Sequence, residues 1–236
     1  MSTPRHVYVI RHCEREDDVN RVWYFNSHFS RDNPPLSERG LIQANDLKRE
    51  FKNVHIDFCF SSPYERCIQT ASKILEGRTN CLINVEPGFL ESGYLVREAG
   101  EKRPNYENDK DLAKRYSNIN TCYKPLYLSP SEDEFEPNTT VRACFTRVKH
   151  TLIQLLKKCD GDILIISHQG PCAAIQEHLL DLRSGELLFP AQATVSKYVE
   201  VPGVYAPRFE EEYLCDCSHL TDRSGLKGKF FYSKTN

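Results

Sequence analysis

Four polar residues follow a short apolar run near the start of the chain. The run is 7–10, and Arg11, His12, Glu14 and Arg15 come next. Such a run is typical of a buried strand, and ligands bind at the C-terminal ends of strands in open α/β sheets. Two guanidinium groups can hold a phosphate through paired hydrogen bonds while an imidazole presents a ring nitrogen to the phosphorus. The pattern indicates a phosphate site, although an ordinary strand end capped by surface charge would have the same composition.

Two later strands repeat this arrangement. Arg66 lies in the first turn of a helix that follows the predicted strand 56–60, and His168 comes directly after the apolar run 163–166. Because parallel strands have their C-terminal ends at one edge of a sheet, we expect both residues to meet the charged group that follows the first strand. A site with two histidines and three arginines suits phosphoryl transfer through a phosphohistidine, because arginines stabilise the transferred charge.

The same chemistry needs further groups. One imidazole must present an unprotonated nitrogen as the nucleophile, and the second can be cationic. An acid must protonate the leaving oxygen and then activate water. Glu91 is the candidate because it closes a strand and loop that return toward the same edge, and Glu86 and Glu14 are weaker candidates. Trp23, in a long polar segment, is a candidate substrate contact, with loop packing as the alternative.

Buried strands alternate with amphipathic helices along the chain. This order predicts an α/β fold, with a mainly parallel sheet and helices on both faces. We expect a single domain over 1–236, with an insertion at about 92–138 that forms a lid or pocket wall and contains a short helix near 109–116. The last strand is predicted at a sheet edge, where two copies could pair. The expected strands are 7–10, 56–60, 82–85, 163–166 and 194–201, and the expected helices are 37–51, 63–76, 140–159 and 173–180.

Composition restricts the classes of partner. A net charge of −2 over 236 residues provides no broad basic surface for nucleic acid, and no stretch is long and apolar enough to span a membrane. The first residues lack a signal-peptide pattern, so we expect a cytoplasmic protein with reduced cysteines. Cys215, Cys217 and His219 have a metal-like spacing, but without a second pair we favour packing over zinc. Four other cysteines are predicted in the core: Cys59, Cys67, Cys144 and Cys172.

Three segments resemble signatures of the histidine phosphatase superfamily, also called phosphoglycerate-mutase-like. Residues 11–15 are similar to its RHGER motif, 61–71 to its second signature and 167–170 to its third. Segments 85–91, 118–125 and 215–217 resemble the branch that holds the TULA phosphatase domains and the ecdysteroid-phosphate phosphatases. The resemblance implies a phosphohistidine on His12, Glu91 as the acid, and neither metal nor cofactor. It also implies a phosphate pocket of Arg11, Arg15, Arg66 and His168.

Two positions depart from the family pattern. Cys13 stands where the family has glycine, and Gln169 replaces a small residue beside the second histidine. We expect the Cβ and sulfur of Cys13 to crowd the phosphate or to provide an oxidisable thiol. We expect Gln169 to narrow the pocket. Neither change removes a group that the reaction needs.

Three functions remain open at this point. The first is a metal-independent phosphatase acting on a phosphorylated small molecule or a phosphoprotein. The second is a phosphoglycerate mutase, which the aromatic residues around Trp23 disfavour. The third is a catalytically weak protein that binds a phosphorylated ligand, suggested by Cys13 and Gln169. The substrate is not specified by the sequence, and a homodimer is expected only from the resemblance and the predicted edge strand.

Overall fold

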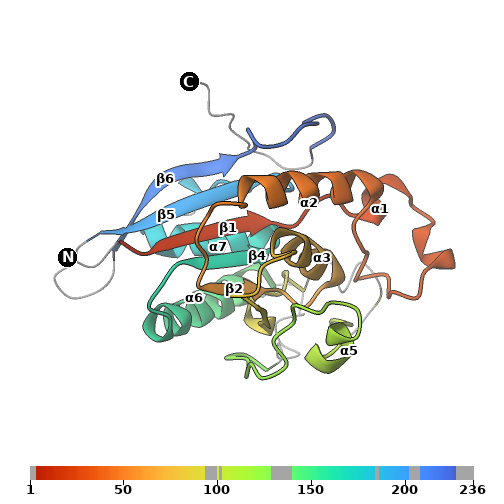
Figure 1. Ribbon diagram of the computed structural model, residues 1–236, viewed down its shortest axis with the longest axis horizontal. Coiled ribbons are helices and arrows are strands. Elements are labelled where there is room, and N and C mark those ends of the chain that lie inside the picture. The colour runs from red at the N-terminus through yellow and green to blue at the C-terminus, as the bar shows by residue number, and fades with distance from the viewer. Residues whose placement is uncertain are drawn as a thin grey trace.

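Within the described residues, six strands form one sheet in the order β3-β2-β4-β1-β5-β6 (Figure 1). This computed structural model describes residues 4–93, 100, 103–128, 140–183, 186–201 and 208–226. The first four strands run parallel, β5 is antiparallel to β1, and β6 is antiparallel to β5. The strands are β1 (His6–Arg11), β2 (Phe58–Ser61), β3 (Ile83–Val85), β4 (Ile163–Ser167), β5 (Val195–Val201) and β6 (Arg208–Asp216).

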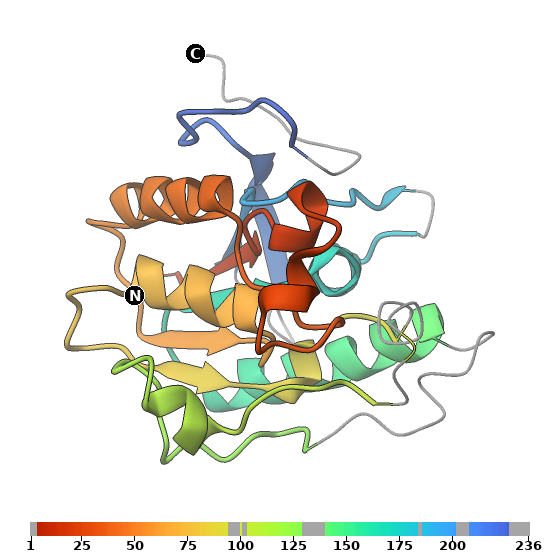
Figure 2. The same cartoon turned by 90° about the vertical axis from the view of Figure 1, so that its right-hand side faces the viewer.

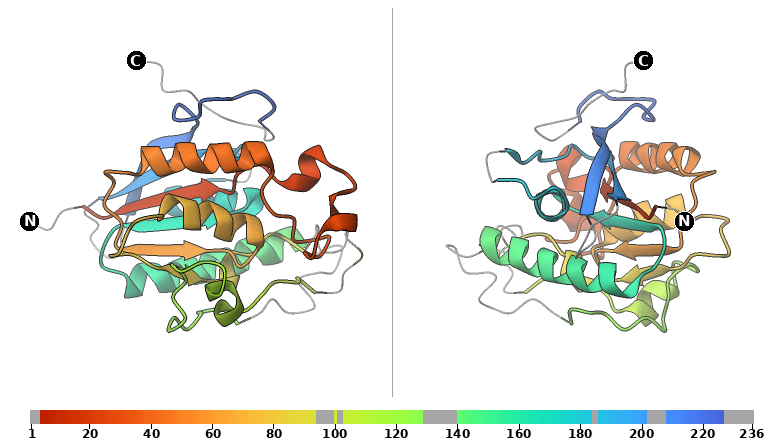
Figure 3. Two further views of the ribbon diagram at one scale, coloured as in Figure 1. Left: turned by 45° about the vertical axis from the view of Figure 1, so that its right-hand side comes forward. Right: turned by 90° about the vertical axis from the view of Figure 1, so that its left-hand side faces the viewer.

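Helices cover both faces of the sheet (Figures 1 and 3). On β4, Leu164 and Ile166 pack into a core cluster with α2 and α3, whereas Ile163 and Ile165 pack into a second cluster with α6 and α7. This alternation follows from the two-residue period of a strand. The helices are α1 (Glu16–Val19), α2 (Glu38–Glu50), α3 (Glu65–Ile74), α5 (Asp109–Ala113), α6 (Thr140–Lys158) and α7 (Gln169–Leu180), with 3-10 turns η1 (Trp23–Asn26) and η2 (Pro87–Phe89).

The predicted α/β class and the mainly parallel sheet are confirmed, but the edge prediction is wrong. The strand predicted at 194–201 is β5, which lies between β1 and β6. The edge belongs to β6, whose centre carries three consecutive glutamates at 210–212. Charged residues are typical of an exposed edge, and they remove the apolar signal by which strands are recognised in a sequence.

The start of α7 was also predicted too late. The helix begins at Gln169 rather than at 173, and His168 is its N-cap. Gly170 and Pro171 give this stretch the composition of a loop, yet proline is tolerated in the first helical turn because its missing N–H has no helical partner there. His168 is therefore held between the end of β4 and the start of α7.

The predicted insertion is described only in part. A helix is confirmed within 109–116, where α5 spans Asp109–Ala113. Residues 94–99, 101–102 and 129–139 lie outside the described residues, so the lid role and the single-domain boundary stay predictions. The four cysteines predicted in the core are buried, and all ten cysteines are free thiols. In the part of the chain that is described, no helix has the length and apolar character needed to cross a membrane.

Candidate active site

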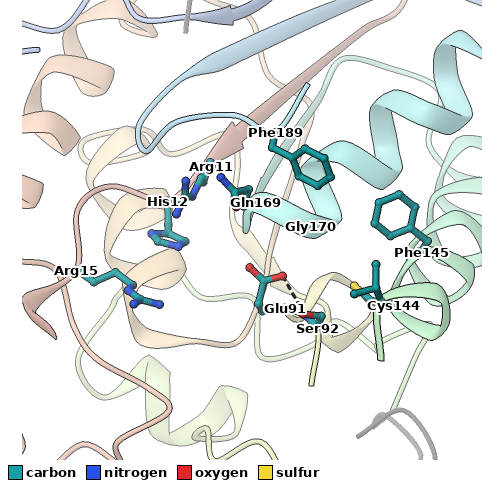
Figure 4. Close-up of a pocket in the computed structure, with 11 residues that line it drawn as sticks. Arg11, His12, Arg15, Glu91, Ser92, Cys144, Phe145, Gln169, Gly170 and Phe189 are labelled. Carbon is teal, nitrogen blue, oxygen red and sulfur yellow. Dashed lines mark hydrogen bonds between the residues drawn. The ribbon is translucent and has the colours of Figure 1, made fainter. Parts of the chain in front are cut away.

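A cavity of about 360 Å³ opens at the edge of the sheet where the parallel strands end. Figure 2 looks toward this edge, with α1 and η1 in front of it. Figure 4 shows Glu91 between His12 and Arg15 on one side and Phe145 and Phe189 on the other. The cavity thus has a charged end and an apolar end. Its lining comprises Arg11, His12, Arg15, Glu91, Ser92, Val141, Cys144, Phe145, Gln169, Gly170 and Phe189.

His12 is held immediately beyond the end of β1. Its backbone N–H donates to the carbonyl of Ser167 at 2.9 Å, which continues the β1–β4 ladder by one residue. Its Nδ1 lies 2.7 Å from the carbonyl oxygen of Cys13. A carbonyl only accepts, so Nδ1 carries the proton and Nε2 is the nitrogen with the free electron pair. The backbone thereby selects the tautomer that a nucleophilic imidazole needs.

The surroundings of His12 favour its neutral form. The side chain is buried, and burial is the largest cause that lowers its pKa well below 6.5. Positive charge on Arg66, Arg11 and Arg15 lowers the pKa further, in that order. Since protonation would add a cation among cations, His12 keeps its electron pair at neutral pH.

The three predicted arginines surround this ring in different ways. Arg11 donates to the carbonyl of Pro190 at 2.9 Å, and burial lowers its pKa to about 10, so it stays charged. Arg15 pairs with Asp17 at 2.9 Å. Arg66 is fully buried and donates only a long bond, 3.4 Å, to the carbonyl of Asp32. Within the described part of the chain its Nε and Nη2 have no hydrogen-bond partner, so they are donors suited to an anion.

His168 lies beside His12, with 5.2 Å between the ring centroids. Its Nε2 is 2.8 Å from the hydroxyl oxygen of Ser62 at the end of β2. Burial, followed by the positive charge of Arg66, lowers its pKa well below 6.5. These surroundings favour the neutral form of the second imidazole, and a cationic role for His168 stays a prediction.

Of the three candidate acids, only Glu91 reaches the cavity. Its Oε1 accepts the backbone N–H of Ser92 at 2.9 Å and faces Gly170, where an added Cβ would lie 2.9 Å from that oxygen. Glu86 is fully buried and accepts from Tyr123 and from the N–H groups of residues 88, 126 and 127. Glu14 is buried against Arg39 and Ser37. Both are structural carboxylates.

The remaining sequence predictions meet different outcomes. The expectation that Cys13 crowds the phosphate is wrong, because its side chain is fully buried in the core cluster formed with α2 and α3. Burial also raises the pKa of this thiol to about 12, which opposes oxidation. Gln169 does line the cavity, whereas Trp23 is buried in η1 and is not among the lining residues. A substrate contact at Trp23 stays a prediction.

The structure adds residues that the sequence interpretation did not single out. Ser62 orients His168, and Phe145 and Phe189 form the apolar end of the cavity.

Among the residues that the structure describes, no three His, Cys, Asp or Glu side chains are grouped to hold a metal ion. His219, in the metal-like sequence pattern, instead bonds the carbonyl of Ala193 at 3.0 Å.

Known proteins share both the sequence pattern and the fold. The family model described as "Histidine phosphatase superfamily (branch 1)" matches residues 7–200. Human ubiquitin-associated and SH3 domain-containing protein A is 28% identical over 215 residues, which cover 75% of this chain and 31% of that protein. Phosphoserine phosphatase 1 of Hydrogenobacter thermophilus is 28% identical over 179 residues, covering 73% of this chain and 74% of that protein. The chain thus spans about a third of the human relative and three quarters of the bacterial one.

Two further relatives carry phosphatase names. The ecdysteroid-phosphate phosphatase of Drosophila melanogaster is 25% identical over 194 residues, covering 70% of this chain and 25% of that protein. The solved structure of an ecdysone phosphate phosphatase from Bombix mori, in complex with tungstate, superposes with a TM-score of 0.64 at 18% identity. It covers 98% of this chain and 97% of that one, which shows a shared fold.

Proposed function

The chain belongs to the histidine phosphatase superfamily, branch 1, and from this premise we propose that it hydrolyses a phosphomonoester through a phosphohistidine on His12. Relatives named as phosphatases support the phosphatase activity itself. The observation that carries the mechanism is the neutral, buried imidazole, whose Nδ1 proton is held by the carbonyl of Cys13 while arginines surround the ring.

In the first step Nε2 of His12 attacks the phosphorus, and the bond from phosphorus to the leaving oxygen breaks. Glu91, in its protonated form, gives a proton to that oxygen. Arg11, Arg15 and Arg66 donate to the phosphoryl oxygens and stabilise their charge in the transition state. His168 lies against the same ring and completes the phosphate pocket.

In the second step a water molecule attacks the phosphorus, and the bond from phosphorus to nitrogen breaks. Glu91, now a carboxylate, takes the proton of that water. Inorganic phosphate leaves, and His12 regains its electron pair. We propose that these steps need no metal, because the arginines supply the positive charge that a metal would otherwise provide.

The far end of the cavity supports an apolar leaving group. Beyond Glu91 the walls are Cys144, Phe145 and Phe189, so an aryl or similar apolar group fits there once the phosphoryl group is held. The same wall disfavours phosphoglycerate, which is small and strongly anionic. A phosphatase is therefore better supported than a mutase.

The test is hydrolysis of p-nitrophenyl phosphate with EDTA, by the wild type and by His12→Asn. We expect the wild type to turn over and His12→Asn to lose at least about 10³-fold in kcat. His55→Asn, at an exposed histidine, is the matched control and should be unaffected. Enzyme denatured during turnover at alkaline pH should carry phosphate on the peptide containing His12, as read by mass spectrometry. Turnover that survives in His12→Asn, or that requires added metal, would contradict the mechanism.

A further inference from the structure

Arg147, on α6, binds the backbone that carries Glu91. Its side chain is buried, with 4% of its surface exposed. Nη1 donates to the carbonyl of Gly88 at 2.8 Å and of Leu90 at 3.0 Å, with a longer contact of 3.4 Å to Pro87. Nη2 donates to the carbonyl of Glu91 itself at 3.3 Å. One guanidinium thus spans the segment 87–91, which we call the Glu91 turn.

Two other contacts hold the same turn against the site. The hydroxyl of Ser167 donates to the carbonyl of Phe89 at 2.7 Å. Gly88 lies so close to α6 that an added Cβ would come within 2.2 Å of the Thr151 hydroxyl oxygen. The carbonyls of the whole Glu91 turn are therefore bound from α6 on one side and from the end of β4 on the other.

We propose that Arg147 is a positioning residue, which places the carboxylate of Glu91 for proton transfer to the leaving oxygen. The inference rests on the proposed function. A guanidinium has five N–H donors in a fixed plane and can bind several carbonyls at once. The ammonium of lysine is a compact charge on one nitrogen and cannot span the same carbonyls. Because Nη2 of Arg147 binds the carbonyl of Glu91, the backbone of Glu91 is fixed and its carboxylate can move mainly by rotation of the side chain. The N–H of Ser92 restricts that rotation by donating to Oε1.

This role predicts a dependence on the leaving group. Nitrophenolate leaves without a proton, so p-nitrophenyl phosphate needs little help from a general acid. Benzyl phosphate is similar in size and fits the same apolar wall, but its alkoxide leaves only when protonated. A displaced Glu91 should slow the second ester far more than the first, whereas a general loss of folded enzyme would slow both equally.

The experiment compares kcat/KM on the two esters for the wild type, Arg147→Lys and Glu91→Gln, because kcat/KM reports the steps up to loss of the leaving group and not the later attack of water, in which Glu91 acts as the base. For Arg147→Lys we expect a loss of about 10- to 100-fold on benzyl phosphate and less than about threefold on p-nitrophenyl phosphate. Glu91→Gln should show the same pattern with a larger loss. The ratio of the two rates is independent of the fraction folded, and Ser167→Ala should shift it in the same direction by a smaller factor.

Arg5→Lys is the matched control. Arg5 also donates to carbonyls of the α6 region, those of Leu156 and Cys159, but at the far end of the helix. It should lower stability and leave the rate ratio unchanged. Equal losses on both esters in Arg147→Lys would overturn the inference and leave the proposed function intact. A wild type that hydrolyses neither ester would overturn both.

Discussion

At the scale of single residues, the chemistry depends on which groups around His12 carry charge. The charged groups that lower its pKa are arginines, and no carboxylate is among the main causes of the shift. The protonated imidazole is thereby disfavoured, while a phosphate dianion is attracted to the same arginines. If His12 is the nucleophile, as we propose, it needs no separate base to remove a proton before it attacks.

The first prediction concerns this pKa. In NMR titrations the ring of His12 should stay neutral to well below pH 6.5, because burial and three arginines oppose its protonation. Arg66 lowers the pKa of His12 more than the other two arginines do, so Arg66→Met should raise this pKa toward its ordinary value. The spectrum of His12→Asn assigns the His12 signal. A His12 signal that titrates at or above pH 6.5 in the wild type would contradict the mechanism.

The second prediction concerns Cys13. Because its side chain packs in the core and not in the cavity, Cys13→Gly should leave kcat/KM within about threefold of the wild type. It should lower the free energy of unfolding by about 1–3 kcal/mol, through lost burial and the greater freedom of glycine. Urea unfolding and steady-state kinetics measure the two effects. Cys122→Gly, at an exposed cysteine, is the control. A tenfold gain in activity would show that the sulfur does obstruct the site.

Residues at strand ends were predicted better than residues brought in by packing. Arg11, His12 and Arg15 line the cavity because the β1–β4 ladder fixes where their segment leaves the sheet. Arg66 and His168 are fully buried near His12 and are not among the lining residues. Phe189 follows no apolar run that would place it, and Arg147 has the sequence context of an ordinary helix. Their positions depend on how α6, α7 and the loops pack, which a single sequence does not show.

At the scale of elements, α6 contributes to both the core and the site. Val148, Leu152 and Leu155 pack in the core, while Phe145, one turn earlier, lines the cavity. All four belong to one apolar face in the sequence, so helical periodicity predicts the helix but not the point where its face leaves the core. The strand β5 was predicted, but β6 was missed for a related reason, since its charged centre removes the apolar alternation of a strand.

The third prediction tests the apolar wall that α6 helps to form. Phe145→Ala should lower kcat/KM for 1-naphthyl phosphate by about tenfold or more, because an apolar contact of this size is worth about 1–3 kcal/mol. Activity toward phosphoserine, whose leaving group has no apolar ring to contact that wall, should change less. Phe25→Ala, at an exposed phenylalanine outside the cavity, is the control. Equal losses on both substrates would place the leaving group elsewhere.

At the scale of the whole molecule, the two histidines of the site link stability to pH. Both His12 and His168 have a pKa well below 6.5 in the folded state, so the unfolded chain binds their protons more readily. Folding is then favoured above about pH 6.5 and opposed as the pH falls below it.

The fourth prediction follows from this linkage. Below about pH 6.5 the free energy of unfolding should fall by up to about 1.4 kcal/mol per pH unit for each of the two histidines. Urea unfolding at about pH 7 and about pH 5.5 measures the slope. The double variant His12→Asn, His168→Asn should show a shallower slope than the wild type. An unchanged slope would mean that these imidazoles are protonated in the folded protein.

Arg66 has a consequence for how the reaction ends. Its buried Nε and Nη2 have no acceptor among the residues that the structure describes. A phosphate group suits these donors both as the bound ester and as the inorganic phosphate that hydrolysis releases. The inorganic phosphate that is released should therefore bind the site it has just left and compete with the next ester. We expect inorganic phosphate to inhibit the enzyme as a competitive product inhibitor. On the most reactive substrates, phosphate release should limit kcat. The rate of turnover would then depend on the phosphate concentration in the surroundings.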